Sequence, residues 1–164
     1  MSKTTTSEEY LKQAYLGEYG GEASFQAWAD RMPEHESSLR LLAEVESATT
    51  NYLRGYLSGE VTEEEVAARV KFGRDRAADF DLGSWTSLLK AVMPIVEEAL
   101  IRLKAAEKDA PTGLETVYRH FTAHEQALAD FFTRELRGED GTSILKNYLA
   151  ETARAMREYS HSCV

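Results

Sequence analysis

The sequence is poor in cysteine, proline and basic residues, and each shortage excludes a class of structure. Its single cysteine, Cys163, excludes an internal disulfide and a cysteine-based zinc site, and we expect it to be an exposed thiol. Only three prolines interrupt the 164 residues, which favours long helices. Lys and Arg total 19 against 28 Asp and Glu, a net charge of -9, so we expect no nucleic-acid partner, because phosphate binding needs clustered basic residues.

Long apolar runs are also lacking. No stretch approaches the roughly 20 apolar residues of a membrane span, and the first ten residues have no signal-peptide core. We therefore expect a cytoplasmic protein without a membrane partner. With 43% hydrophobic residues, the chain is expected to form one domain, residues 1–164, with a sizeable core.

Helical periodicity, in contrast, is abundant, and strand-like runs are few. Ser7, Thr62 and Ser84 suit helix N-caps, Thr62 with Glu65 in a capping-box pattern, while Pro94 should kink or break its helix. The expected helices are 7–32, 34–58, 62–82, 84–108, 112–137 and 143–159. These predict an all-α fold: a four-helix bundle with a helical crossover between its second and third helices and an extra C-terminal helix.

Ionisable residues interrupt the apolar stripes of three expected helices. Glu18 and Glu22 continue the stripe of the first helix, and Glu46 that of the second. His124 lies on the inner face of the helix over 112–137, with His120 one turn earlier. Buried carboxylates must be paired, protonated or bound to a cation, and these stripes contain no Lys or Arg.

A divalent metal bound by Glu18, Glu22, Glu46 and His124 would resolve this imbalance of charge. Carboxylate and imidazole together suit iron, manganese or zinc. The residues leave a second interpretation open, a purely structural polar network in which His124 is a hydrogen-bonded core histidine.

The segment "YLGEYGGEA" carries three glycines, Gly17, Gly20 and Gly21, around the first two of these acids. Each glycine inside a helix costs about 1 kcal/mol relative to alanine. We expect the glycines to allow close packing of a neighbouring helix, and the alternative is that they leave room for a ligand or for movement of the carboxylates.

The pattern of inward acids resembles the ferritin-like superfamily of di-iron carboxylate bundles. That family uses a Glu from each of two helices and a Glu-x-x-His from each of the other two. The segments "YLGEYGGEA", "LLAEVESATTNYL" and "AHEQALADFF" are similar to those of uncharacterised bacterial ferritin-like proteins. Glu18 and Glu97 match the two single glutamates, while Glu46 and Glu125 match the glutamates of the two motifs. Glu18 and Glu46 are separated by the same number of residues as Glu97 and Glu125.

Both Glu-x-x-His motifs are incomplete in this sequence. Thr49 and Leu128 stand where the two histidines are expected, and His124 is the substitute imidazole. Glu97 and Glu98 flank the apolar stripe of their helix, and a kink at Pro94 would be needed to turn either one inward.

The resemblance implies a ferritin-like fold and an iron or manganese site of one or two ions inside the bundle. Open coordination positions would take dioxygen, peroxide or a small-molecule substrate, so the implied activity is that of an oxidoreductase. The candidate catalytic residues are Glu18, Glu46 and His124, and the candidate metal ligands are Glu18, Glu22, Glu46, Glu97, His120, His124 and Glu125.

Three other interpretations stay open. A metal-free bundle would use its inward Glu and His residues as acids and bases or to line a small-molecule pocket. A DinB-like bundle would bind a metal through three histidines, His35, His120 and His124. The chain could instead be an interaction or dimerisation bundle, and flat bundle faces predict a homodimer.

Overall fold

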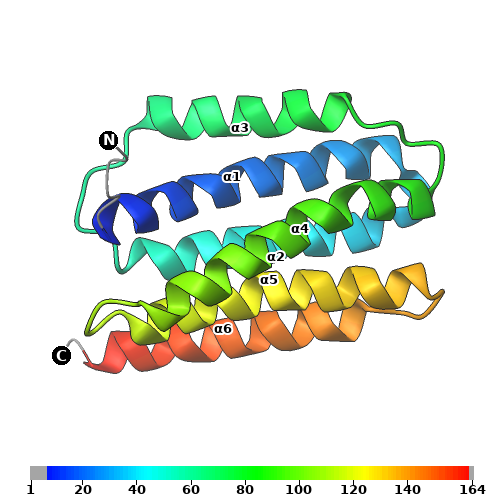
Figure 1. Cartoon of the computed structure of the whole chain (residues 1–164). Helices are drawn as coiled ribbons and strands as arrows, with labels where there is room; N and C mark the ends of the chain where they lie inside the picture. The colour runs from blue at the N-terminus through cyan, green and yellow to red at the C-terminus, as the bar shows by residue number, and fades with distance from the viewer. Residues whose placement is uncertain (1–6, 163–164) are drawn as a thin grey trace.

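The computed structural model describes the backbone of residues 7–162 and the side chains of residues 7–159, so Cys163 lies outside the described residues. Within this range the chain forms six α-helices, one short 3-10 helix and no strand, which confirms the predicted all-α class (Figure 1). The elements are α1 (Ser7–Arg31), η1 (Pro33–His35), α2 (Glu36–Arg54), α3 (Glu63–Ala78), α4 (Trp85–Lys108), α5 (Glu115–Leu136) and α6 (Thr142–Ser162).

Local sequence determines where several helices begin. The Thr62 hydroxyl accepts a hydrogen bond from the Glu65 backbone N–H at 3.2 Å, and the Glu65 carboxylate accepts one from the Thr62 backbone N–H at 2.9 Å. This is the predicted capping box. Ser84 caps α4 by accepting from the backbone N–H of Ser87 at 3.1 Å. Ser7, predicted as a cap, is already part of α1.

α4 is not broken at Pro94, although Pro94 lacks the N–H that would bond to the carbonyl of Lys90. Both residues are exposed, so water can satisfy that carbonyl on the outer face of the helix.

The helices pack around α1, α2 and α5 (Figure 1). α2 and α3 both pack on α1, with α3 on its outer side, while α4 packs on α5. α6 packs against both α2 and α5, so the predicted extra helix is part of the bundle. In Figure 1, α4 runs obliquely across the view from the end of α1 to the start of α5.

Two glycines bring α3 against α1. A Cβ atom on Gly73 would lie only 2.2 Å from the backbone oxygen of Gly20, so side chains are excluded from this contact. The Ser24 hydroxyl lies in the same interface, 2.9 Å from the carbonyl oxygen of Gly20 and 3.0 Å from that of Gly73. The α1–α3 interface is therefore built from small residues and backbone.

The buried apolar residues form two clusters, one toward each end of the bundle. One cluster includes Trp28, Leu42 and Phe131, and the other includes Leu11 and Tyr52. On α1, α2 and α5 alike, the positions between the two clusters hold buried polar residues: Glu18, Ser24, Glu46, Thr49, Thr50, Thr122 and His124. A polar layer thus divides the core across the middle of the bundle.

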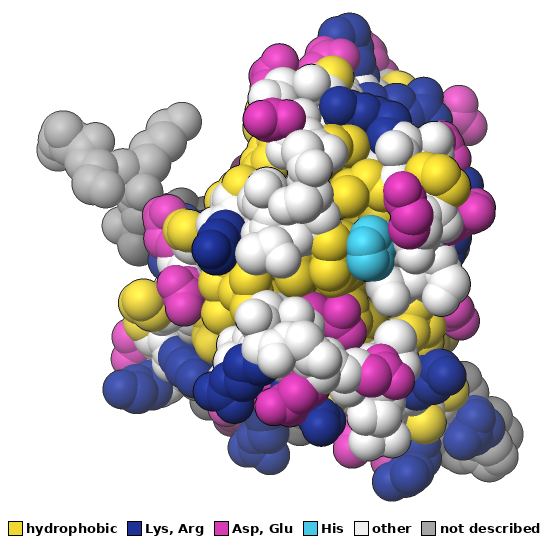
Figure 2. All heavy atoms as spheres, turned by 90° about the vertical axis from the view of Figure 1, so that its right-hand side faces the viewer, with side chains coloured by type: hydrophobic (Ala, Val, Ile, Leu, Met, Phe, Trp, Pro, Cys, Tyr) yellow, Lys and Arg dark blue, Asp and Glu magenta, His cyan; other side chains and the backbone are white. Residues whose placement is uncertain are grey.

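One end of the molecule carries hydrophobic side chains between charged ones (Figure 2). There α1 and α5 end, α4 and α6 begin, and partly buried apolar residues such as Phe80, Leu82 and Trp85 pack against the core. None of the helices described is long and apolar enough to cross a bilayer.

Candidate metal centre

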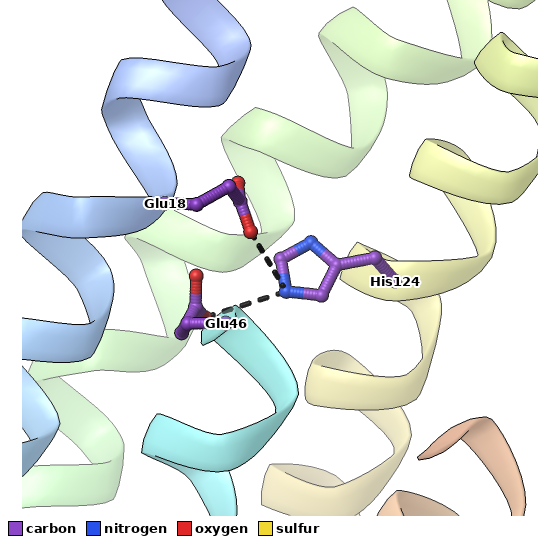
Figure 3. Close-up of side chains that lie close together, drawn as sticks. All are labelled: Glu18, Glu46 and His124. Carbon is purple, nitrogen blue, oxygen red and sulfur yellow. Dashed lines mark ion pairs between the residues drawn. The ribbon is translucent and has the colours of Figure 1, made fainter. Parts of the chain in front are cut away.

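Three ionisable side chains from three helices converge in the polar layer (Figure 3). Glu18 projects from α1, Glu46 from α2 and His124 from α5. The Nε2 atom of His124 lies 3.4 Å from an Oε atom of each glutamate. The side chains are almost sealed from solvent, with 4%, 4% and 1% of each residue exposed. These were the three candidate catalytic residues from the sequence, and the structure brings them together.

Several buried polar atoms in this region form no hydrogen bond with the residues that the structure describes. They are both ring nitrogens of His124, one carboxylate oxygen of Glu18 and one of Glu125, although His124 Nε2 and the Glu18 oxygen face each other as an ion pair at 3.4 Å. Leaving a buried polar group unpaired costs about 1–3 kcal/mol, and more when it is charged. Hydrogen-bonding capacity at this place is therefore left for a proton, a water molecule or a cation.

Electrostatics of the cluster favour protons or a cation. Burial raises the pKa of Glu18 well above its usual range, and the negative charges of Glu46 and Glu125 raise it further. Burial by itself lowers the pKa of His124, but the charges of Glu46 and Glu125 outweigh it, so the pKa is raised. Glu18 therefore resists ionisation in the absence of a positive partner.

The geometry fits one divalent cation. One nitrogen of His124 and one carboxylate oxygen each from Glu18 and Glu46 all lie within 4.8 Å of one another. Metal–ligand distances near 2.1 Å place two ligand atoms of one ion about 3 to 4 Å apart, so small side-chain adjustments suffice. Carboxylate oxygen and imidazole nitrogen are ligands suited to iron, manganese or zinc.

Gly21 makes room for one of these carboxylates. A Cβ atom at this position would lie 2.6 Å from the Oε2 atom of Glu46 and 2.8 Å from its Cδ. Gly17 has nothing within 4 Å of its would-be Cβ, and Gly20 contacts α3. The two interpretations of the glycines therefore apply to different positions: packing at Gly20, and space for a carboxylate at Gly21.

A cavity of about 380 Å³ adjoins the cluster, and most of the residues that line it belong to α1, α4 and α5. Glu18, Glu46 and Glu125 line it together with Arg76 of α3. Its apolar walls include Phe25, Trp28, Val92, Val96, Phe121 and Leu128. The volume and the apolar lining with a few polar groups are typical of a small-molecule site.

Glu125 lies on the cavity wall, beside the cluster. Burial raises its pKa to about 7, the positive charge of His124 lowers it, and the charge of Glu46 raises it. Its Oε2 atom is buried and unpaired, but its carboxylate does not belong to the group formed by Glu18, Glu46 and His124.

Besides Glu125, three predicted ligands lie outside the group. Glu97 is exposed, because the unbroken α4 keeps both it and Glu98 on the outer face, where Glu98 pairs with Arg102 at 2.7 Å. Glu22 is half-buried, and its carboxylate accepts a hydrogen bond from Gln26 at 2.9 Å.

His120, the third, belongs to a separate hydrogen-bond network. Its Nε2 atom lies 3.0 Å from the Thr152 hydroxyl and 3.2 Å from the Tyr148 hydroxyl. Burial and then the positive charge of His124 lower its pKa to about 4, so it is neutral.

The three-histidine arrangement is not assembled. His35 stacks on Trp85 with ring centroids 4.4 Å apart, at the start of α2, whereas His120 contacts Tyr52 near the end of that helix. The 17 residues between His35 and Tyr52 correspond to about 25 Å along the helix. The DinB-like interpretation therefore lacks its third ligand.

The two residues that replace the expected histidines have other partners. The Thr49 hydroxyl bonds to the carbonyl oxygen of Val45 at 2.9 Å and to the Tyr148 hydroxyl at 2.7 Å. Leu128 is buried in the apolar core and reaches the cavity wall. Neither supplies a metal ligand.

Sequence reasoning missed Arg76, because α3 was expected only as a crossover. The signal was weak: Gly73 and Ala77, the buried residues of α3, are small and form no apolar stripe. Their smallness, with an arginine between them, was the available indication of a close helix contact.

Comparisons of the chain with protein-family models, with curated proteins and with solved structures find no match in any of the three. The resemblance to ferritin-like bundles therefore stays a prediction, and the function has to be argued from the site itself.

Proposed function

We propose that this protein binds one iron or manganese ion through Glu18, Glu46 and His124 and is an oxidoreductase acting on a small molecule in the adjoining cavity. The observation that carries the metal site is the convergence of two buried carboxylates and an imidazole, with a ligand atom of each lying within 4.8 Å of the others. Assigning oxidation rests on the resemblance to ferritin-like proteins.

The side chains of the cluster would bind the ion, and the cavity walls would surround the substrate. Glu18 and Glu46 would neutralise the charge of a divalent ion, and His124 would hold it through Nε2. The bound ion would supply Lewis acidity and one-electron redox chemistry. The apolar walls would exclude water from the reacting end of the substrate, which strengthens electrostatic interactions there.

The donor set favours one ion over two. A two-ion site of the ferritin-like type would need a ligand from a fourth helix, and the residue predicted for that role, Glu97 of α4, is exposed. We expect untagged protein, stripped with a chelator and titrated with Mn²⁺ or anaerobic Fe²⁺, to bind about one ion per chain by elemental analysis.

Matched variants test the ligands. Glu46→Gln keeps the shape of the side chain but removes its charge, and we expect it to weaken Mn²⁺ binding at least about 100-fold, as should His124→Ala. Glu97→Gln and His120→Ala, which change predicted ligands outside the group, should bind Mn²⁺ like the unchanged protein. No uptake of either metal, or normal uptake by Glu46→Gln, would contradict the proposed site.

A further inference from the structure

We propose that the cavity selects a carboxylic acid with an apolar body, and that Arg76 binds its carboxylate. This inference rests on the proposed function for the chemistry done to the ligand, whereas the binding itself depends on Arg76 and the cavity. It adds the substrate class, which neither the cluster nor the sequence pattern indicates.

Arg76 has a buried donor that none of the described residues accepts from. Its Nε atom is buried without a hydrogen-bond partner, and the side chain lines the cavity. A guanidinium group has five N–H donors in a planar fork, and its Nε and one Nη together match the two oxygens of a carboxylate. The unpaired Nε therefore leaves one side of the fork open to a ligand.

Neighbouring residues hold this guanidinium group in place. One Nη atom of Arg76 donates to the Ser24 hydroxyl at 3.2 Å, and Ser24 is itself fixed between the carbonyls of Gly20 and Gly73. The guanidinium carbon lies 5.7 Å from the centre of the Phe72 ring, within the range of a cation–π contact. A fixed cation loses less conformational entropy on binding than a mobile surface arginine.

The other basic residue that lines the cavity is already engaged. Arg102 forms an ion pair with Glu98 at 2.7 Å on the exposed face of α4. Burial lowers the pKa of Arg76, and the negative charge of Glu46 acts against this by raising it. Arg76 nevertheless forms no ion pair within 4 Å among the described residues. Arg76 is therefore the group that can take the negative charge of a ligand.

Charge balance favours a singly charged head group. Three glutamates line the cavity, and a divalent ion would neutralise two of them, Glu18 and Glu46. The third, Glu125, remains on the cavity wall and repels anions, so a ligand held by one arginine is less disfavoured with the single charge of a carboxylate than with the double charge of a phosphate. Aliphatic and aromatic walls would bury the rest of the molecule.

The cavity is accessible from outside. Its lining includes Gln13 and Gly17 of α1 and Ile95 and Arg102 of α4, all of which are exposed. Gly17 carries no side chain at this edge, and its would-be Cβ points into open space. A ligand can thus enter between α1 and α4 without movement of the helices.

The test compares four head groups on one tail: octanoate, octyl phosphate, octanol and octylamine. Binding is measured by calorimetry on chelator-treated protein and again on Mn²⁺-loaded protein. We expect octanoate to bind most tightly in both, about 10-fold or more tighter than octanol, because a hydrogen bond to a charged group contributes about 1.5–3 kcal/mol.

Variants of Arg76 identify the group responsible. Arg76→Met should weaken octanoate about 10- to 100-fold and leave octanol nearly unchanged, and Arg76→Lys should restore part of the preference. Arg69→Met is the control, because Arg69 bonds to Gln13 across the same α1–α3 interface but does not line the cavity. Unfolding curves of all variants establish that they are folded.

The outcomes separate this inference from the metal site. Metal uptake with equal affinity for octanoate and octanol, or a preference for octylamine or octyl phosphate, would overturn the inference. A preference for octanoate that survives in Arg76→Met would overturn it as well. A preference for octanoate that depends on Arg76 in a chain without metal uptake would support it and contradict the proposed function.

Discussion

Gly21 and Glu46 form a contact between α1 and α2 in which the absence of a side chain has a specific use. The Glu46 carboxylate lies where a side chain on Gly21 would be. A Cβ atom built on Gly21 would be 2.6 Å from the Oε2 atom of Glu46. Helix propensity opposes glycine here by about 1 kcal/mol relative to alanine. Glycine at position 21 therefore lowers the stability of α1 but leaves room for the Glu46 carboxylate.

We predict that Gly21→Ala separates stability from metal binding. The carboxylate is the mobile end of a side chain and can move away, so stability should be unchanged or rise by up to about 1 kcal/mol. Its displacement should weaken Mn²⁺ binding about 10-fold or more. Urea unfolding and Mn²⁺ titration measure the two quantities.

Gly17→Ala is the matched control for this experiment. Its new methyl group would meet nothing within 4 Å, so it should gain about the same helix stability and keep normal Mn²⁺ binding. Equal Mn²⁺ affinities for the two alanine variants would count against the role assigned to Gly21.

At the scale of the elements, α3 determines whether the cavity has its basic residue. α3 packs on α1 alone through Gly73, Ser24 and Gly20, and Trp28 and Arg31 of α1 donate hydrogen bonds to the carbonyl of Ala77 at 3.1 and 2.8 Å. These contacts between α1 and α3 position Arg76. α3 therefore supplies a basic residue to the cavity, while its Ala77 is buried in the apolar core.

We predict that Gly73→Ala moves α3 away from α1. The added Cβ would lie 2.2 Å from the backbone oxygen of Gly20, which cannot move aside as a side chain could. Overpacking of this kind costs about 1–3 kcal/mol, and hydrogen exchange of the α3 amides should accelerate. Arg74→Ala, at the adjacent exposed position, should change neither quantity. Unaltered exchange in Gly73→Ala would show that the α1–α3 contact is looser than described.

At the scale of the whole molecule, the polar layer makes the stability of the bundle depend on the protonation of its acids. The layer lies between two apolar clusters, so ionised acids within it are poorly solvated. The pKa values of Glu18 and His124 are raised, and that of Glu125 is about 7. The folded chain therefore retains protons that the unfolded chain has released.

We predict that the free energy of unfolding of chelator-treated protein falls as the pH rises from about 4.5 toward neutrality. A group with a raised pKa in the folded state contributes stability at low pH that is lost between its unfolded and folded pKa values. For Glu125 the shift from 4.5 to about 7 corresponds to about 3 kcal/mol. The raised pKa values of Glu18 and His124 act in the same direction. The pKa of His120, lowered to about 4 by burial, acts in the opposite direction below pH 6.5. It offsets a shift of about the size of that of Glu125, so the fall in stability there is the difference between these contributions.

Urea unfolding at a series of pH values measures this slope. Glu125→Gln should flatten it, because the amide does not titrate, while Glu97→Gln, on the exposed face of α4, should leave it unchanged. Mn²⁺ should raise stability most at neutral pH, where it replaces the missing protons. A slope of the opposite sign would mean that these acids are ionised in the folded, metal-free chain.

Much of the fold could be predicted from the sequence because its signals are local. The capping box at Thr62, the cap at Ser84 and the six helical segments follow from interactions between residues a few positions apart. The inward direction of Glu18, Glu46 and His124 follows equally from the helical period of the residues around them. These features needed no knowledge of how the helices pack.

Which residues meet at one point was decided by the tertiary structure. Helical period places Glu22 and His120 near the inner faces, yet their positions along and around the helices leave Glu22 half-buried and His120 in another hydrogen-bond network. Glu97, which flanks the apolar stripe of its helix, is exposed because α4 is not broken at Pro94. Arg76 reached the cavity only because two glycines brought α3 close to α1. The sequence by itself thus determined the helices and the faces that carry buried acids, because both depend on local periodicity. The composition of the site depended on how those helices cross, which contacts between distant residues decide.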